Sequence, residues 1–223
     1  MKTSISVVIP AYNEAQRIAE CIQAIKPQLL IGDEIIVVDN NSTDQTAQIA
    51  QSLGARVIVE TQQGISHARN AGFAAAKNQI IARTDADTIV TANWLSTIRD
   101  YYANSSDAKS AIITGPVYVR EVLPIKLGMH QGIAKRTIGH ETLVGGNLAM
   151  LQDSWQIISP YLSNSDELAE DVEQAIIAHQ HGVKIVFLPK MIVSTSGRRV
   201  FSNPIRAFKR WHQKLKNTKK LIK

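Results

Sequence analysis

The chain has 223 residues, 44% of them hydrophobic, which is enough to bury the core of one domain. Its single cysteine, Cys21, excludes an internal disulfide and favours a reducing, cytoplasmic setting. The net charge of +6 is concentrated at one end, because residues 203–223 hold eight Lys and Arg and no acid, which leaves −2 for residues 1–202.

Short apolar runs alternate with helix-sized segments in the first part of the chain. Strands are predicted at 5–9, 34–39, 56–59 and 79–82. Helices are predicted between them at 15–28, 43–53 and 65–77, and the second opens with a capping-box pattern, Ser42-Thr43-Asp44-Gln45. Strand runs without alternation indicate burial on both faces, as in a parallel sheet. The order predicts βαβ units in an open, doubly wound sheet, whose ligands bind beyond the carboxyl ends of the strands.

The remainder of the chain predicts further elements of both kinds. Helices are predicted at 91–103, 122–139 and 166–181, and strands at 111–119, 183–188 and 191–195. Gly145 and Gly146 interrupt an apolar run, which indicates a tight bend or the close approach of another molecule to the backbone. On the helix at 166–181, Asp171 lies nearest the apolar stripe and Glu170 nearly opposite it. Asp171 is therefore the acid that we expect to face a cleft.

Two carboxylates, Asp85 and Asp87, follow the fourth predicted strand. Like charges one residue apart repel, and a divalent cation removes the conflict. Such a pair suits Mg²⁺ or Mn²⁺ held together with the oxygens of a diphosphate, although alone it also fits an exposed acidic turn. Arg69, near the start of the helix at 65–77, either meets a phosphate or forms a surface salt bridge. The first strand is not followed by Gly-x-Gly-x-x-Gly, which disfavours NAD.

Six short stretches occur in one order within residues 4–180. They are Ser6 to Glu14, Ile36 to Asp44, Ala68 to Gly72, Asp85-Ala86-Asp87, Gly145-Gly146-Asn147 and Glu170-Asp171. Together they resemble the family 2 glycosyltransferases. The resemblance implies an α/β chain with the GT-A fold, in which a Rossmann-like, doubly wound, mostly parallel sheet is joined by a small mixed sheet on the acceptor side. It divides the chain into one catalytic domain, with a nucleotide-sugar-binding half at 1–118 and an acceptor-binding half at 119–200, and a basic amphipathic tail at 201–223.

The function that the resemblance implies is metal-dependent, inverting transfer of a sugar from a nucleotide diphosphate. A UDP-sugar is the expected donor, and a hydroxyl of a glycan, a lipid or a small molecule the expected acceptor. The implied roles are donor binding for Pro10, Tyr12, Glu14, Asp39 and Asp85, metal binding for Asp87, general base for Asp171, and acceptor binding for Gly145, Gly146, Asn147 and Glu170.

The sequence departs from the family pattern at two points. The frequent Gln-x-x-Arg-Trp motif is absent, and Arg198 and Arg199 in the basic loop that follows the last predicted strand are expected to act on the diphosphate instead. The membrane helices of the larger synthases are also absent, which disfavours processive synthesis with export.

Two other functions stay open at this point. A nucleotidyltransferase also needs a nucleotide fold and a metal, but usually carries a glycine-rich phosphate loop after its first strand. A non-catalytic nucleotide-sugar-binding protein would leave Asp171 without a task.

The basic tail predicts a helix in which Ile205, Phe208, Trp211 and Leu215 share one face. Such a helix suits an anionic membrane surface, which would place the protein on the inner face of the cell membrane. A helix packed on the body of the protein and a disordered tail are the alternatives. Nucleic acid is not an expected partner, since no recognised motif or aromatic platform accompanies the charge.

Overall fold

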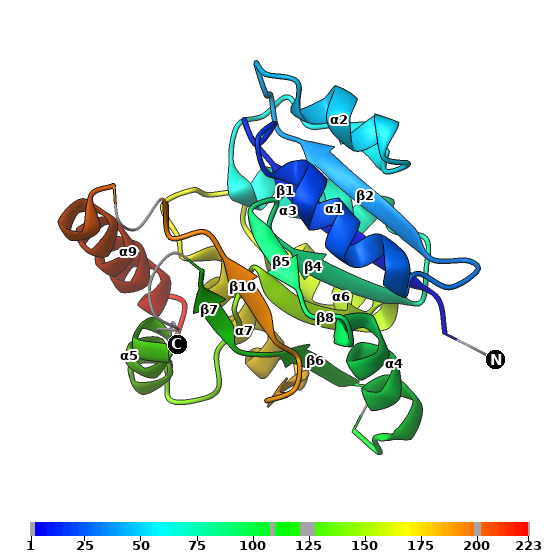
Figure 1. Ribbon diagram of the computed structural model, residues 1–223. Helices are drawn as coiled ribbons and strands as arrows, with labels where there is room; N and C mark the ends of the chain where they lie inside the picture. Colours follow the sequence, from blue (N-terminus) through cyan, green and yellow to red (C-terminus); the bar gives the residue numbers. More distant parts are fainter. Residues whose placement is uncertain (1–2, 108–109, 121–127, 199–201, 223) are drawn as a thin grey trace.

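The computed structural model describes residues 3–107, 110–120, 128–198 and 202–222. A seven-stranded sheet forms its centre (Figure 1). In spatial order the strands are β3 (Arg56–Val59), β2 (Glu34–Asp39), β1 (Ile5–Ala11), β4 (Ile80–Thr84), β8 (Asn147–Leu151), β6 (Ala111–Thr114) and β9 (Lys184–Phe187). All are parallel except β8, which runs antiparallel to both of its neighbours.

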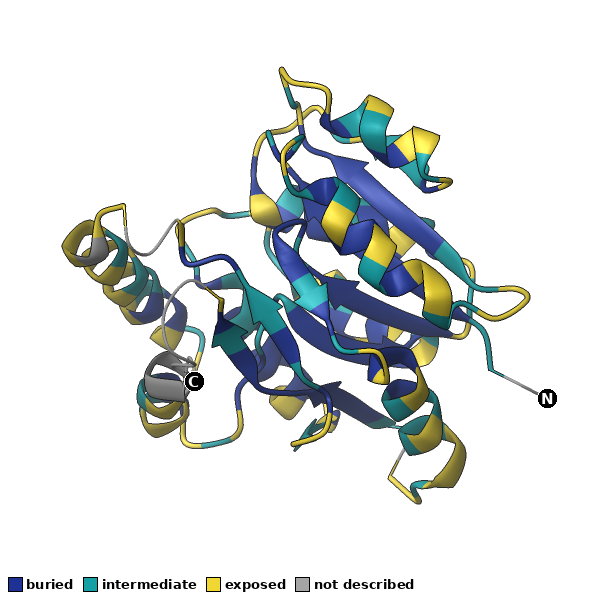
Figure 2. Cartoon of the chain, in the orientation of Figure 1, coloured by how far each residue is buried: buried dark blue, intermediate teal, exposed yellow. Residues whose placement is uncertain are grey.

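Helices cover both faces of this sheet. They are α1 (Ile18–Ile25), α2 (Thr46–Ser52), α3 (Ile65–Ala75), α4 (Trp94–Asn104), α5 (Gly128–Ile138), α6 (Gln152–Ile158), α7 (Glu170–Gln180) and α9 (Pro204–Lys219), with 3₁₀ turns at Lys26–Gln28 and Ser159–Tyr161. Successive side chains of β1 enter opposite cores, Val7 and Ile9 toward α1 and α4, and Val8 toward α3 and α7. Figure 2 shows the resulting buried centre between exposed helix faces. The predicted doubly wound sheet is confirmed.

A second, three-stranded sheet lies beside the first and is mixed, as predicted. Its central strand β10 (Val193–Thr195) is antiparallel to β5 (Thr88–Val90) and parallel to β7 (Val117–Val119). The prediction of one continuous strand at 111–119 is wrong, because the chain breaks at Gly115 and Pro116 and sends β6 and β7 into different sheets. Pro116 has no backbone N–H to donate to a ladder. At Gly115 a Cβ would lie 2.0 Å from the carbonyl oxygen of Met191, so the chain passes too close for any side chain.

Four predicted helices begin three or four residues later than the sequence pattern suggested, and two of them, predicted from residues 15 and 91, begin at Ile18 and Trp94. The helix predicted from residue 43 begins at Thr46, and the predicted capping box does not form. Asp44 instead accepts hydrogen bonds from the backbone N–H groups of Thr46 (3.0 Å) and Ala15 (3.1 Å). The helix predicted from residue 166 begins at Glu170. The helix predicted at 122–139 is described only from Gly128 onward.

The basic tail is a helix, α9, that packs on α7 and α5 at one side of the molecule (Figure 1). Leu215 is buried in this contact, whereas Ile205 and Phe208 nearer its start are exposed. The structure therefore agrees with the alternative of a helix packed on the body, and membrane contact through the exposed end stays a prediction.

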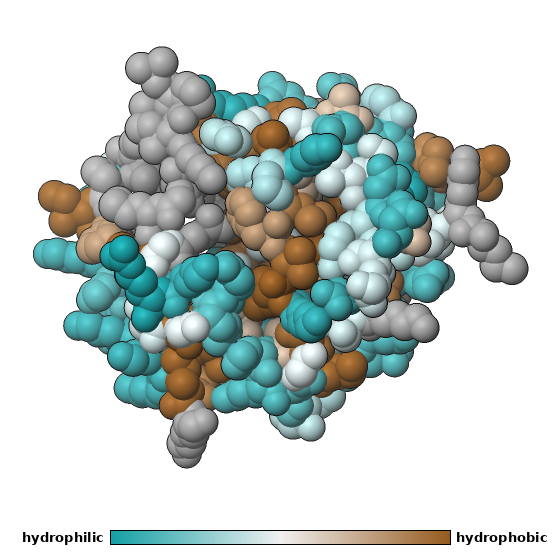
Figure 3. Space-filling model, turned by 90° about the horizontal axis from the view of Figure 1, so that it is seen from below, coloured by the Kyte–Doolittle hydropathy of each residue, from teal (hydrophilic) through white to brown (hydrophobic). Residues whose placement is uncertain are grey.

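Among the described residues, no helix combines the length and apolarity required to cross a bilayer. On the face seen from below, apolar side chains gather near the middle and hydrophilic ones flank them (Figure 3).

Candidate active site

A cleft of about 680 Å³ opens at the carboxyl ends of β1 and β4. The start of α3, the bend before β8, the start of α7 and one face of α9 complete its walls. Most of the predicted site residues line it, namely Pro10, Tyr12, Glu14, Asp85, Asp87, Gly145, Gly146, Glu170 and Asp171. The fold thus brings together side chains that are separated by up to 161 positions in the sequence, at the edge where open α/β sheets bind their ligands.

Hydrogen bonds between two loops shape the donor side of the cleft. Asn13, which follows β1, has a φ of 53°, a left-handed conformation that Asn tolerates better than most residues. Its backbone N–H donates to Ser42 Oγ (3.0 Å), and its side-chain oxygen accepts from the Thr43 N–H (2.8 Å). Next to it, the Glu14 N–H donates to Thr46 Oγ1 (2.8 Å). The polar residues that follow β2 therefore hold the loop that presents Tyr12 and Glu14.

Asp85 and Asp87 meet different surroundings although one residue separates them. The Asp85 side chain is 40% exposed in the cleft, whereas Asp87 is buried and accepts a hydrogen bond from Thr195 Oγ1 (3.2 Å). The described residues contain no cluster of three or more His, Cys, Asp or Glu that would bind a metal without help. Two hard carboxylates facing an open cleft fit Mg²⁺ or Mn²⁺ when a ligand's phosphate oxygens complete the coordination shell.

Two buried arginines hold Glu170 at the start of α7. Arg83 Nη1 lies 2.7 Å from Glu170 Oε1, and Arg69 Nη1 lies 3.0 Å from Glu170 Oε2. Arg83 Nη2 also lies 3.5 Å from Asp85 Oδ1, so one guanidinium joins the acid after β4 to the acid on α7. Burial acts to raise the pKa of Glu170, but the charges of Arg83 and Arg69 outweigh it and hold the pKa below its usual value.

The two glycines of the bend before β8 leave room for these carboxylates. A Cβ on Gly145 would lie 2.6 Å from Glu170 Oε1, and a Cβ on Gly146 would lie 2.7 Å from Asp85 Oδ2. Any larger residue would push one acid out of place. The groups that approach the glycine pair are carboxylates of the same chain, and the predicted approach of another molecule to this backbone stays a prediction.

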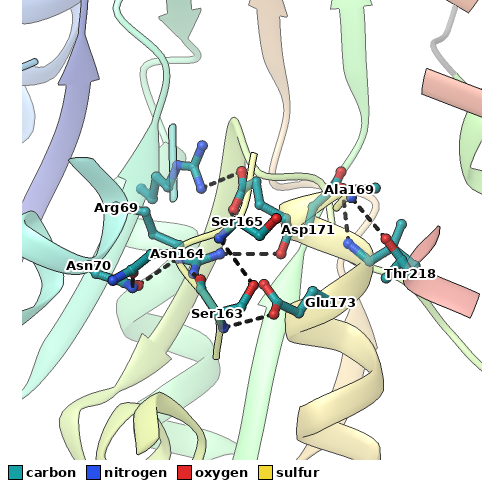
Figure 4. Close-up of polar contacts among 12 residues, drawn as sticks. Arg69, Asn70, Ser163, Asn164, Ser165, Ala169, Asp171, Glu173 and Thr218 are labelled. Carbon is teal, nitrogen blue, oxygen red and sulfur yellow. Dashed lines mark hydrogen bonds and ion pairs between the residues drawn. The ribbon is translucent and has the colours of Figure 1, made fainter. Parts of the chain in front are cut away.

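Asp171 follows Glu170 in the first turn of α7 (Figure 4), and its side chain lines the cleft. Burial raises the pKa of its carboxyl from 3.8 to about 6, and the charge of Glu170 adds to the rise. A carboxylate with a pKa in this range accepts a proton more readily than an ordinary aspartate does at neutral pH. The sequence pattern placed Glu170 nearly opposite the apolar stripe and favoured Asp171 alone as the acid that faces the cleft. Glu170 lines the cleft as well, because the helix begins at Glu170 and its side chain turns toward Arg69 and Arg83.

Four predicted site residues do not line the cleft. Asp39 is buried at the end of β2, where its Oδ1 accepts from the Ser42 N–H (3.3 Å), and Arg69 lies behind Glu170. Asn147 is buried, accepts a hydrogen bond from Trp94 Nε1 (2.9 Å) and donates to the carbonyls of Pro116 and Met191. Arg198 Nη2 lies 2.6 Å from Glu14 Oε1. These contacts position the residues of the wall.

The predicted role of Arg199 concerns a residue that lies outside the described ranges.

Sequence reasoning missed four charged residues of the wall, namely Arg83, Asp166, Arg210 and Lys214. Arg83 is a charge within an apolar strand and only two positions before Asp85, which is a signal that it pairs with an acid. Arg210 and Lys214 are four residues apart in the tail, so they share one face of a helix.

Comparison with known proteins bears on this cleft. The family model described as glycosyl transferase family 2 matches residues 6–143, which is well over half of the chain. The chain belongs to glycosyltransferase family 2. The match includes both loops of the donor side and the Asp85-Ala86-Asp87 stretch, and it ends just before the glycine pair.

Curated relatives of this family 2 chain are also glycosyltransferases. It is 33% identical over 124 residues to glycosyltransferase GlyG of Streptococcus pneumoniae, an alignment that covers 53% of this chain and 40% of the relative. It is 36% identical over 99 residues to glycosyltransferase AglE of Haloferax volcanii, covering 41% and 33%. The chain thus spans well under half the length of these relatives.

Solved structures of the same fold cover more of the chain. Glucosyl-3-phosphoglycerate synthase from Mycobacterium tuberculosis, in complex with Mn²⁺, uridine diphosphate and glucosyl-3-phosphoglycerate, superposes with a TM-score of 0.74 over 99% of this chain and 80% of that one, at 18% identity. S. aureus TarS 1-349 in complex with UDP-GlcNAc superposes with a TM-score of 0.69 over 86% and 58%, also at 18% identity. These similarities confirm the predicted GT-A fold.

Proposed function

We propose that the chain transfers a sugar from a nucleotide diphosphate, with a UDP-sugar as donor, to a hydroxyl group of an acceptor, with inversion at the anomeric carbon. One observation carries the proposal: Asp85, Asp87 and Asp171 face the same cleft from the end of β4 and from the start of α7. Such a transfer needs negative charge neutralised on the leaving diphosphate and a base for the incoming hydroxyl, and the two groups of acids supply positions for both.

The donor half of the cleft suits a nucleotide. Tyr12 offers a 45% exposed ring beside Pro10 and Ala11, and the acid side chains of Glu14 and Asp85 suit hydrogen bonds from ribose hydroxyls. The complexes of the two similar structures contain uridine diphosphate or UDP-GlcNAc, which supports a UDP-sugar here.

Asp87, with Asp85 beside it, would hold the divalent cation. A bound Mg²⁺ or Mn²⁺ supplies charge neutralisation for the departing diphosphate. Mn²⁺ in the complex of the M. tuberculosis synthase supports this choice of ion. Thr195 fixes the Asp87 carboxylate through its hydroxyl, and Arg198 fixes Glu14 nearby.

Asp171 is the base of the proposed reaction. As the acceptor oxygen forms its bond to the anomeric carbon, its proton passes to Asp171, and the bond between that carbon and the diphosphate oxygen breaks with its electron pair leaving on the diphosphate. Positive charge builds on the sugar ring during the exchange, and the carboxylates of the cleft stabilise it. Glu170 is held by two arginines and therefore does not compete with Asp171 as the proton acceptor.

Attack by the acceptor on the face opposite the leaving group inverts the anomeric configuration. A retaining reaction through a covalent intermediate would need a carboxylate free to attack the donor sugar first. The ion pairs of Glu170 and the place of Asp171 on α7, a different element from the one that carries Asp85 and Asp87, favour the single displacement.

Thermal unfolding in the presence of UDP, GDP and a set of their sugars, with and without Mn²⁺, tests the donor assignment. A ligand at 100 times its dissociation constant stabilises the folded state by about 2.7 kcal/mol. We expect UDP and one UDP-sugar to raise the melting temperature only when Mn²⁺ is present. If no nucleotide raises it under any condition, the transferase proposal is wrong.

A further inference from the structure

The tail helix α9 contributes two basic side chains to the cleft, Arg210 and Lys214. They lie four residues apart and so project from one face of the helix. Among the described residues that line the cleft, the remaining cation is Arg83 on β4, which is already paired with Glu170 and Asp85. The tail therefore adds positive charge to a cleft in which most of the other charged side chains are acidic.

The contacts of α9 fix where these two cations lie. Leu215 is buried against the core beneath α7. The Thr218 hydroxyl accepts a hydrogen bond from the Ala169 N–H (2.9 Å; Figure 4), and Asn217 Nδ2 donates to the Glu167 carbonyl (3.3 Å). Both hydrogen bonds go to the segment that leads directly into Glu170 and Asp171. The helix is thus anchored to the base-bearing side of the cleft.

In the part of the chain that the structure describes, neither cation forms an ion pair. Within residues 3–107, 110–120, 128–198 and 202–222, no carboxylate lies within ion-pair distance of the Arg210 or Lys214 side chain. Partial burial lowers the pKa of Lys214, and the charge of Arg210 lowers it further, while the more distant Asp166, Glu170 and Asp171 act in the opposite direction. Two like charges at the edge of one cleft are stabilised when an anion lies between them.

We propose that Arg210 and Lys214 bind a negatively charged group of the acceptor, a phosphate or a carboxylate, and so place its hydroxyl beside Asp171. The inference rests on the proposed transferase function and adds the class of acceptor to it. The hydrogen bonds that anchor α9 go to the Glu167 carbonyl and the Ala169 N–H, just before Glu170 and Asp171, so the two cations enter the cleft from the side of the proposed base. The position proposed for the donor diphosphate is at the loop after β4, where Asp85 and Asp87 lie.

The test compares two double variants that remove the same charge from the same helix. The cleft variant, Arg210→Gln with Lys214→Gln, removes the two cations that line the cleft. The exposed-face variant, Lys216→Gln with Lys219→Gln, removes two exposed lysines that do not line it. Lys219 lies about 180° around the helix from Arg210 at 100° per residue. All three proteins are first checked for equal melting temperatures and for UDP binding with Mn²⁺ by calorimetry. Failure of the wild type to bind UDP would contradict the proposed donor, and this result is distinct from the test of the anion site.

The probes of the anion site are inorganic phosphate and glycerol 3-phosphate, titrated into protein saturated with UDP and Mn²⁺. We expect both to bind the wild type and the exposed-face variant equally, and to bind the cleft variant at least about tenfold more weakly, because charge-assisted hydrogen bonds are lost. Equal binding to all three proteins, or absence of binding to the wild type, overturns the proposal. A loss of UDP affinity confined to the cleft variant also overturns it and assigns the cations to the donor diphosphate.

Vesicles distinguish a soluble acceptor from a lipid one. Sedimentation is measured with phosphatidylcholine vesicles that contain or lack phosphatidic acid. Cosedimentation that requires phosphatidic acid and is lost only in the cleft variant identifies a lipid phosphate as the ligand. Phosphate binding without such cosedimentation identifies a soluble one. Cosedimentation that is lost only in the exposed-face variant, without phosphate binding in the cleft, overturns the proposal in favour of a membrane-facing helix.

Discussion

Replacement of Asp171 by Asn tests both the proposed role of this residue as base and its effect on stability. The structure fits this substitution, because Asp171 Oδ1 accepts a hydrogen bond from the Val172 N–H (2.9 Å), and the side-chain oxygen of Asn is able to accept the same bond. The variant keeps the shape of the side chain and removes only its charge and its capacity to take a proton. We expect UDP binding with Mn²⁺ to be unchanged and transfer to fall by about 10²–10⁴-fold.

The stability effect of the same variant has a definite sign. The rise in pKa from 3.8 to about 6 means that the folded state binds the proton more tightly than the unfolded state does. A pKa difference of this size corresponds to roughly 3 kcal/mol in the free energy of unfolding. We expect the ionised carboxylate to cost about 1–2 kcal/mol of stability, because water still reaches it. The ionised carboxylate therefore destabilises the wild type above pH 6, and this cost disappears as the pH falls toward 4. Asp171→Asn should be more stable than the wild type at pH 7 and equally stable near pH 4.

Urea unfolding at pH 7 and pH 4 measures the stability difference, and release of UDP in the presence of acceptor measures turnover. Glu167→Gln is the matched control, since it removes an exposed acid four residues earlier and outside the cleft. It should leave both quantities unchanged. Full turnover by Asp171→Asn would remove Asp171 from the role of base, and a variant less stable than the wild type at pH 7 would refute the assigned pKa shift.

Three further perturbations follow from the same charges. The transfer rate of the wild type should fall about tenfold for each pH unit below about 6, because Asp171 is then protonated. Glu170→Gln removes a neighbouring negative charge, so the fall in rate should begin at a lower pH than in the wild type. A pH–rate profile that is the same for both proteins would show that the charge of Glu170 does not affect Asp171. Asp87→Ala should abolish the rise in melting temperature that UDP causes in the presence of Mn²⁺, and EDTA should abolish it for the wild type. If the variant shows the same rise as the wild type, Asp87 does not hold the ion. Arg83→Met leaves Glu170 with one partner and should lower the free energy of unfolding in urea by about 3 kcal/mol; a change below about 1 kcal/mol would show that the buried pair is not coupled as described.

The donor side of the cleft was predictable because its signals are local. Asp85 and Asp87 follow a short apolar strand, and the loops after β1 and β2 carry their polar residues within a few positions of the strand ends. In each case the residue's surroundings are set by neighbours in the sequence.

The acceptor side was harder to predict because contacts distant in sequence determine it. The segment before Glu170 has a helical pattern, but α9 takes up its backbone groups through Thr218 and Asn217, some 50 positions away, and α7 starts later. Arg83 turns toward Glu170, a partner 87 positions along the chain. Asn147 finds its hydrogen bonds at Trp94, Pro116 and Met191, which the single sequence does not connect.

A crystal structure with a non-transferable UDP-sugar and Mn²⁺ tests the central claim most directly. The account predicts the ion on the Asp87 carboxylate and the diphosphate, with the Asp171 carboxylate on the side of the anomeric carbon opposite the leaving oxygen. An ion bound away from Asp87, or an Asp171 side chain that points away from the sugar, would contradict it.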